Sequence, residues 1–271
     1  MREILVHVDG GARSRVRIEV AMRLAKRFGS RLTGLFAQVE SHRPSAIARM
    51  PSDNLKRAEA EAAELFTDLV ETSGLATRWW RLAHGEPGHV SSETVFCGRY
   101  FDLVVMGQPD PKGTEVPDDL VEEVVLNSGR PVLVVPHVGP VPTLGERIAV
   151  AWNASREASR AVHDAIPMLQ AAKSVTVISL RGQDTADATV QVGLPPVDIL
   201  GHLGEYGIAV AGERLAGEDI GKMDLLLSRV CDLGADLLVM GGHGHYGMSL
   251  LRGSGTRYLL KHMTLPVLLS H

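Results

Sequence analysis

The chain has 271 residues, of which 45% are hydrophobic, 22% charged and 4% aromatic, a composition typical of globular proteins. Its formal net charge of −4 argues against a dedicated nucleic-acid-binding protein, which would be basic. No apolar run approaches the ~18 residues that cross a bilayer, and the first residues lack a signal-peptide core. We therefore expect a cytoplasmic protein with no membrane partner. Cys97 and Cys231 have no metal-ligand spacing, and we expect both to be buried in a reducing compartment.

Apolar runs alternate with amphipathic segments through the first 135 residues. Val16, Val20, Leu24 and Phe28 recur at helical spacing, and Gly29 follows where a C-cap glycine belongs. Strands of Val, Ile and Leu that alternate with helices predict an α/β fold with a parallel sheet covered on both faces. The expected strands are 4–8, 31–39, 77–82, 101–106 and 131–135, and the expected helices are 16–28, 55–69, one from Pro87, and 118–127.

The same pattern starts again after residues 136–145, which hold three prolines and two glycines and have the composition of a linker. ILVHVD at 4–9 corresponds to IAVAWN at 148–153, and DLVVMG at 102–107 corresponds to DLLVMG at 236–241. We therefore predict a tandem duplication, with one domain at residues 1–136, the linker at 136–145 and a second domain at 146–271.

A glycine-rich stretch at residues 235–261 is predicted to form a short buried strand, a turn and a helix. Glycines of this density let a backbone approach a ligand closely, and the helix N-terminus behind them adds partial positive charge. The segment 241–262 contains Arg252, Arg257 and Lys261 and no Asp or Glu. The stretch has the character of a phosphate cradle, although such a turn is equally compatible with a tight strand–helix connection.

These glycines are similar to the G-x2-G-x9-G-(S/T) nucleotide loop of ATP-binding universal stress proteins, and the whole chain resembles a tandem member of that family. The resemblance implies two Rossmann-like, adenine nucleotide alpha hydrolase-like domains, each a five-stranded parallel sheet flanked by helices. It implies binding of an adenine nucleotide (ATP, ADP or AMP, with or without Mg²⁺) in the second domain. It also implies that strands 131–135 and 266–269 pair within the chain, and that the chain forms a homodimer.

The family's site can be transferred to this sequence residue by residue. Gly241 and Gly244 fit the G-x2-G element. After nine further residues the motif requires a glycine, but Ser254 stands at that position, so either Gly253–Ser254 or Gly255–Thr256 serves as the G-(S/T) pair. Asn153 stands where the family usually has an Asp that contacts adenosine, and it is equally suited, with Ser155, to cap a helix. The expected nucleotide-binding residues are Ala151, Trp152, Asn153, Leu180, Met240, Gly241, Gly244, His245, Arg252, Gly253, Ser254, Gly255 and Thr256.

The first-half counterpart of the loop, residues 107–130, has the opposite character. Pro109, Pro111 and Pro117 remove backbone donors that a phosphate cradle needs. Acidic residues outnumber Lys112 and Arg130 there, so a triphosphate would meet negative charge. We therefore predict that the first domain is degenerate and structural, and that the second domain keeps the ligand site.

The sequence gives little sign of catalysis or of a metal centre. His243 and His245 lack a nearby third ligand, so we expect no metal site. The glycine-rich loop offers no carboxylate, and Asp236 is expected at the opposite end of its strand, so we assign no catalytic residue. The leading hypothesis is a stress-response protein that binds an adenine nucleotide and acts through a protein partner that the sequence does not identify. The alternatives are a nucleotide-free dimerisation scaffold and a slow ATP hydrolase.

Overall fold

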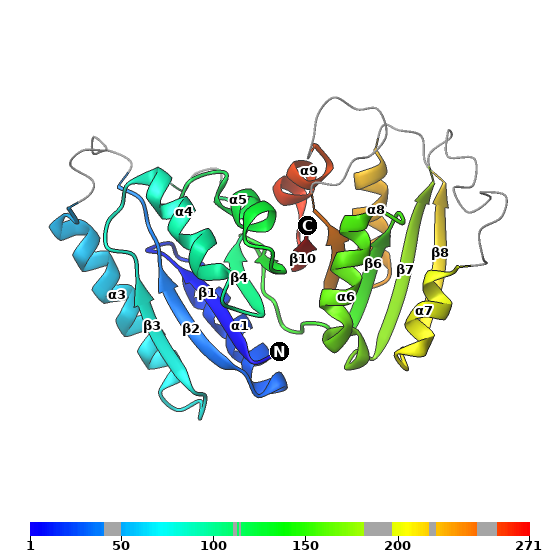
Figure 1. Cartoon of the computed structure of the whole chain (residues 1–271), viewed down its shortest axis with the longest axis horizontal. Helices are drawn as coiled ribbons and strands as arrows, with labels where there is room; N and C mark the ends of the chain where they lie inside the picture. Colours follow the sequence, from blue (N-terminus) through cyan, green and yellow to red (C-terminus); the bar gives the residue numbers. More distant parts are fainter. Residues whose placement is uncertain (41–49, 111–112, 114, 182–196, 217–220, 243–253) are drawn as a thin grey trace. The chain divides into compact units, whose positions relative to one another are not determined.

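The fold is described from a computed structural model, which describes residues 1–40, 50–110, 113, 115–181, 197–216, 221–242 and 254–271 (Figure 1). The chain divides into two compact units, Met1–Val141 and Pro142–His271. The division falls inside the proline- and glycine-rich stretch 136–145. Among the described residues, no helix combines the length and the apolar character required to cross a membrane.

The first unit is a parallel sheet whose strands alternate with helices along the chain. Its strand order is β3-β2-β1-β4-β5, so the direction of winding reverses between β1 and β4. Helix α1 packs on β1, β2 and β4 and against α3, which packs on β2 and β3, whereas α4 packs on α5. The elements are β1 (Glu3–Val8), α1 (Ser14–Phe28), β2 (Arg31–Phe36), α3 (Asp53–Val70), β3 (Thr77–Arg81), α4 (Pro87–Gly98), β4 (Leu103–Gly107), α5 (Leu120–Asn127) and β5 (Val132–Val135).

The second unit repeats this arrangement, with strand order β10-β9-β6-β7-β8 and all described pairings parallel. Helix α6 packs on β6, β9 and β10, and α8 packs on α9. Its elements are β6 (Arg147–Trp152), α6 (Arg156–Gln170), β7 (Ser174–Arg181), α7 (Ile199–Glu205), β8 (Val210–Ala216), α8 (Lys222–Asp232), β9 (Leu237–Gly241), α9 (Ser254–His262) and β10 (Val267–Ser270). The predicted α/β fold, with parallel strands flanked by helices, is confirmed.

The central strand pairs of the two units have matching register. Ile4 pairs with Leu103 in the first unit, and Ile148 pairs with Leu237 in the second. A carboxylate fixes the amino end of each pair: Asp102 accepts a hydrogen bond from the Glu3 amide (3.1 Å), and Asp236 accepts one from the Arg147 amide (2.9 Å). Asp236 therefore lies at the end of β9 opposite the predicted ligand site, as expected.

The core of each unit lies between its sheet and its helices. The central strands β1, β4, β6 and β9 are buried except at their end residues, as their continuous aliphatic sequences require. Helix α1 ends at Gly29, whose φ of 64° is the left-handed conformation that a C-cap glycine adopts, as predicted.

Two expectations about burial need correction. Of the four apolar residues at helical spacing in α1, Val20 and Leu24 are buried, whereas Val16 and Phe28 are only half-buried. The buried face also includes Arg17, Ile18 and Ala21, and the apolar pattern missed its full extent because a charged residue occupies one of its central positions. Cys231 is exposed and Cys97 is half-buried, so neither is the buried thiol that the sequence suggested.

Candidate functional site

The carboxyl ends of the central strands are where doubly wound sheets bind ligands, and each unit has one such edge. In the second unit this edge brings together several of the predicted residues. Ala151 of β6 pairs with Met240 of β9 on one side and with Ile178 of β7 on the other. Leu180 lies in β7 directly after Ser179, the partner of Trp152. The predicted adenine-side residues therefore share one edge of one sheet.

Asn153 leaves β6 through a tight turn that begins helix α6. Its side-chain Oδ1 accepts a hydrogen bond from the Ser155 amide (3.1 Å), while Ser155 Oγ accepts one from the Ala158 amide (3.1 Å) and caps the helix. Between them Ala154 has a φ of 58°, a left-handed conformation that this turn imposes. The capping role is therefore present. Among the described residues the Nδ2 group of half-buried Asn153 makes no hydrogen bond, so it remains able to donate to a ligand.

Gly241 is the last residue of β9, and its backbone lies very close to the first turn of α6. A Cβ atom at this position would lie 2.6 Å from the backbone nitrogen of Ala158 and 2.6 Å from the backbone carbon of Glu157. Only glycine fits there without a backbone shift. The next amide, that of Gly242, donates to the Ser270 carbonyl (2.8 Å), which holds the end of β9 against β10.

The predicted phosphate side is only partly within the described residues. Gly244, His245, Arg252 and Gly253 lie outside them, as does His243. Ser254 begins α9, followed by half-buried Gly255 and by Thr256, which is buried and has interactions of its own. The first turn of α9 has no acidic residue, whereas Lys261 and His262 stand in its last turn.

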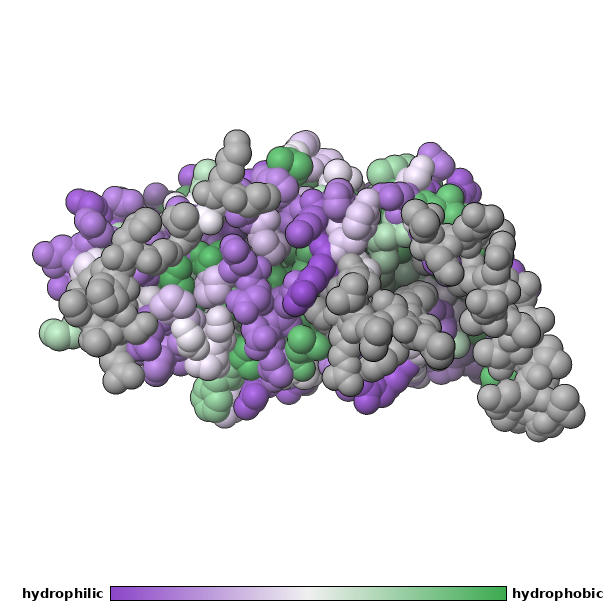
Figure 2. Space-filling model, turned by 90° about the horizontal axis from the view of Figure 1, so that it is seen from above, coloured by the Kyte–Doolittle hydropathy of each residue, from purple (hydrophilic) through white to green (hydrophobic). Residues whose placement is uncertain are grey.

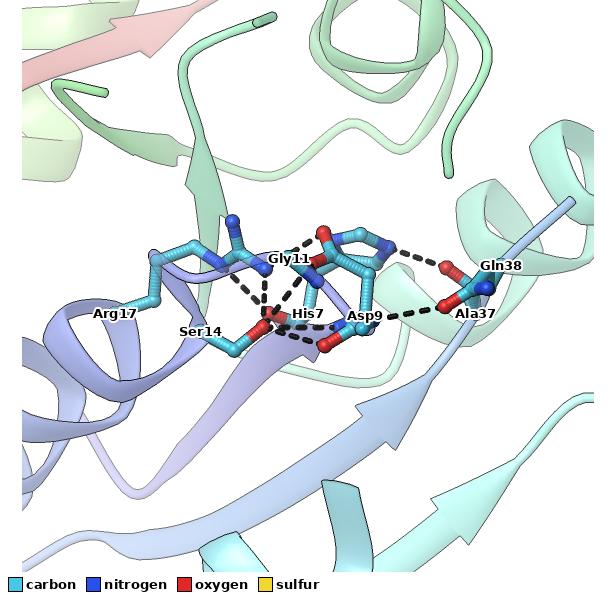
Figure 3. A network of polar contacts seen from close by, with 8 residues as sticks. His7, Asp9, Gly11, Ser14, Arg17, Ala37 and Gln38 are labelled. Atoms are coloured by element: carbon cyan, nitrogen blue, oxygen red, sulfur yellow. Dashed lines mark hydrogen bonds and ion pairs between the residues drawn. The ribbon is translucent and has the colours of Figure 1, made fainter. Parts of the chain in front are cut away.

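The equivalent edge of the first unit carries a buried polar network that the sequence did not suggest (Figure 3). Arg17 Nη2 lies 2.6 Å from Asp9 Oδ2 and donates to Ser14 Oγ (2.7 Å), while Arg17 Nε donates to the His7 carbonyl (3.1 Å). Asp9 Oδ1 accepts from the Gly11 amide (2.8 Å) and from Ser14 Oγ (3.0 Å). Both carboxylate oxygens of Asp9 are therefore engaged inside the protein.

The electrostatics of the network keep Asp9 ionised and His7 neutral. Burial alone would raise the pKa of Asp9, but the charge of Arg17 and the hydrogen bonds from Arg17 and the Gly11 amide lower it to about 2, with a further contribution from His7 only when its ring is protonated at low pH. Burial lowers the pKa of His7, although the nearby Asp9 opposes this. Neutral His7 donates through Nε2 to the Ala37 carbonyl (2.8 Å), so its Nδ1 faces Asp9 at 3.7 Å.

Arg17 also occupies space above the neighbouring strand. A Cβ atom on Gly107, the last residue of β4, would lie 2.5 Å from Arg17 Nη1 and 3.2 Å from its Cδ. The guanidinium therefore lies directly on the Gly107 backbone. A sequence signal existed for this pair: Arg17 interrupts an otherwise apolar helix face directly after a strand that ends in Asp9.

The two edges differ at corresponding positions. The strand registers make Ile148 the equivalent of Ile4, so Asn153 is the equivalent of Asp9. By the same spacing in the sequence, Ala158 is the equivalent of Ser14 and Ala161 is the equivalent of Arg17. Ala158 and Ala161 are both buried. The first unit thus fills its strand edge with an internal ion pair, and the second unit has small side chains at those positions.

The surface seen from above is mainly hydrophilic, with hydrophobic residues in small separate groups (Figure 2). Isolated apolar residues of this kind are ordinary on a protein surface.

Comparison with known proteins agrees with this architecture. Residues 145–271 match the model of the universal stress protein family. A universal stress protein from Archaeoglobus fulgidus DSM 4304 has a similar structure, with a TM-score of 0.73 and 18% sequence identity, covering 99% of this chain and 97% of its own. A functionally unknown protein from Pseudomonas aeruginosa PAO1 is similar with a TM-score of 0.60 and 19% identity, covering 100% of this chain and 92% of its own. No curated protein matches the chain.

The second unit therefore belongs to the universal stress protein family. Over its full length, the chain has the fold of a universal stress protein structure of matching extent.

Proposed function

We propose that the second unit binds one adenine nucleotide, ATP, ADP or AMP, and that the chain acts through nucleotide-dependent partner binding in a stress response. The observation that carries the proposal is the difference between the two strand edges. Asp9 is neutralised by Arg17 in the first unit, whereas the second unit has Asn153 with a donor group available and Ala161 in place of the arginine. Membership of the second unit in the universal stress protein family adds support.

The proposed site is assembled from two sides. Asn153, Trp152 and the backbone of Ala151 would contact the adenosine, and Leu180 and Met240 would complete the apolar wall. The glycine-rich loop with Gly241, Gly244, Gly253 or Gly255, and the side chains of His245, Arg252, Ser254 and Thr256, would hold the phosphates. In this proposal the first unit is structural, and the chain assembles as a homodimer, which light scattering coupled to size-exclusion chromatography would measure.

Calorimetric titration of the full chain with ATP, ADP and AMP, each with and without Mg²⁺, tests the proposal. We expect about one nucleotide per chain. Gly244→Val should abolish binding because a branched side chain blocks close approach of the phosphates. Gly113→Val is the matched control. Gly113 lies in the first-unit counterpart of the glycine-rich loop, so its substitution should leave nucleotide binding unchanged.

Mass spectrometry of gently purified protein identifies which nucleotide, if any, is retained. Two equivalent sites per chain, or binding lost in Gly113→Val but kept in Gly244→Val, would contradict the assignment to the second unit. Absence of any nucleotide, in purification and in titration, would favour the nucleotide-free scaffold. Phosphate release above background would favour the slow ATP hydrolase.

A further inference from the structure

The first unit contains a cavity of about 110 Å³ above the buried network, between the ends of β1, β4 and β5 and the loop that precedes α5. Arg13, Arg17, Gln108 and His137 contribute polar side chains to its wall. Ligand pockets for drug-sized molecules are usually about 300–1,000 Å³. The cavity is therefore too small for an adenine nucleotide, and its occupant must differ from the ligand proposed for the second unit.

Two nitrogen atoms of the wall are buried and unsatisfied. Arg13 Nε and His137 Nδ1 are inaccessible to solvent and have no hydrogen-bond partner among the described residues. The Arg13 side chain and the His137 backbone are nevertheless held by hydrogen bonds. Arg13 Nη2 donates to the Pro136 carbonyl (2.6 Å), and the His137 amide donates to Gln108 Oε1 (2.9 Å). The Arg13 guanidinium is thereby joined to the residue that precedes His137, and both side chains line the cavity.

Buried polar groups without partners are uncommon, since each costs free energy comparable to a lost hydrogen bond. An acceptor oxygen in the cavity would satisfy Arg13 Nε directly. It would also satisfy His137 in the tautomer that carries the proton on Nδ1.

The charge of Arg13 points to the same kind of occupant. Arg17 is compensated by Asp9, but Arg13 forms no ion pair with any carboxylate among the described residues. Burial, and secondly the adjacent charge of Arg17, lower the pKa of the Arg13 guanidinium. A negatively charged occupant would offset both effects.

Four acidic residues also line the cavity, Asp9, Asp110, Glu115 and Asp118. Asp9 is paired with Arg17, and Asp110 and Glu115 each take part in interactions of their own. Asp118 is exposed, so solvent screens its charge. These acids disfavour a large or highly charged anion, and they leave room for one small anionic group beside Arg13.

We propose that this cavity is a second, separate binding site that takes a small oxyanion, a phosphate or carboxylate group, held by Arg13 Nε and His137 Nδ1. The site lies in the unit that has lost the features of a nucleotide site. It would let the chain respond to a small anionic metabolite independently of nucleotide.

Nuclear magnetic resonance of the full chain tests the site directly. The arginine Nε–H signals and the histidine ring signals are followed during titration with inorganic phosphate and, separately, with acetate, against sodium chloride at matched ionic strength. We expect saturable shifts of the Arg13 Nε–H and His137 signals with at least one of the two anions. The two titrations distinguish phosphate from carboxylate as the preferred group.

Substitutions provide the controls. Arg13→Gln should weaken the anion's affinity, read from the His137 ring signal, at least about tenfold, because a charge-assisted hydrogen bond is lost. Arg15→Gln is the matched control, since Arg15 is exposed on the same helix and pairs only with Glu19 at 3.9 Å. It should leave the affinity unchanged. His137→Ala offers an independent test, read from the Arg13 signal, in case Arg13→Gln fails to fold.

Several results would overturn the proposal. The first is an absence of saturable shifts with both anions, which would mean that water alone fills the cavity. The second is an equal shift with sodium chloride or at Arg15 Nε–H, which would mean a general salt effect. Nucleotide titration of Arg13→Gln should match that of the unaltered chain, so failure of this site and failure of the nucleotide site remain distinguishable.

Discussion

Arg17 illustrates how one buried charge determines what a strand edge can bind. Its guanidinium engages Asp9, Ser14 and the His7 carbonyl, and its side chain covers the Gly107 backbone. A carboxylate at the end of the first strand would otherwise be available to a ligand. In this unit its negative charge stabilises the fold instead.

Replacing Arg17 by Met should strongly destabilise the chain. The substitution keeps much of the volume but leaves the Asp9 carboxylate buried without its partner, which typically costs about 3–5 kcal/mol. Urea unfolding measures the change in the free energy of unfolding. Arg15→Met, at an exposed position on the same helix, should change it by less than about 1 kcal/mol. A loss below about 1 kcal/mol in Arg17→Met would show that the ion pair contributes little.

The low pKa of Asp9 makes a second prediction at the scale of one residue. Its folded-state pKa of about 2 lies below the ordinary value of 3.8, so the folded state binds the proton less readily than the unfolded state. The resulting stabilisation, about 2 kcal/mol, is complete above the ordinary value and is lost as the pH falls from about 4 toward 2.

Comparison of the unaltered chain with Asp9→Asn isolates this contribution. The difference between their free energies of unfolding should be constant near neutral pH and should shrink by about 2 kcal/mol on acidification through this window. A difference that stays constant down to pH 2 would contradict the assignment of the shift to Asp9.

At the scale of elements, the end of a strand and the first turn of a helix meet at the carboxyl edge of the sheet in each unit. In the second unit Gly241 of β9 packs against the backbone of α6, and Ser155 caps that helix. Much of this could be predicted from the sequence: the strands, the Gly29 C-cap and the Asn153–Ser155 turn all follow from local residue preferences. The burial of Arg17 in α1 could not, because Asp9, the partner that makes a buried arginine acceptable there, follows a different element, β1.

Gly241→Ala tests the strand–helix contact. Its Cβ would meet backbone atoms of α6, which cannot move aside as a flexible side chain can, so we expect a loss of about 1–3 kcal/mol in the free energy of unfolding. Gly255→Ala is the control: its Cβ would lie 3.3 Å from the mobile end of Met223, and alanine favours the helix. An unchanged free energy of unfolding in Gly241→Ala would mean that α6 can shift away from β9 at no cost in stability.

At the scale of the whole molecule, two units with the same strand order have edges of different chemistry. The repeat of motifs predicted the duplication of a parallel α/β pattern, but not the strand order, and the division between the units falls inside the proline- and glycine-rich stretch. The sequence also predicted that the first edge had lost its ligand site, but from the acidic, proline-rich loop alone. For the Asp9–Arg17 pair the sequence offers only a charged residue on an apolar helix face, and for the cavity beside Arg13 it offers no signal, because both depend on side chains from separate strands and helices meeting in space.

The ion pair beside Gly107 has an evolutionary consequence. If the first unit once bound nucleotide, a return to that state would require removal of Arg17 to reopen the edge. That single substitution leaves the Asp9 carboxylate charged, buried and without a partner. The evolutionary intermediate that lacks Arg17 is therefore destabilised before it could gain any benefit from binding a ligand. Changing Asp9 first leaves Arg17 in the same position. The two residues therefore restrict each other's substitution, and an edge filled by this ion pair is easier to acquire than to reverse.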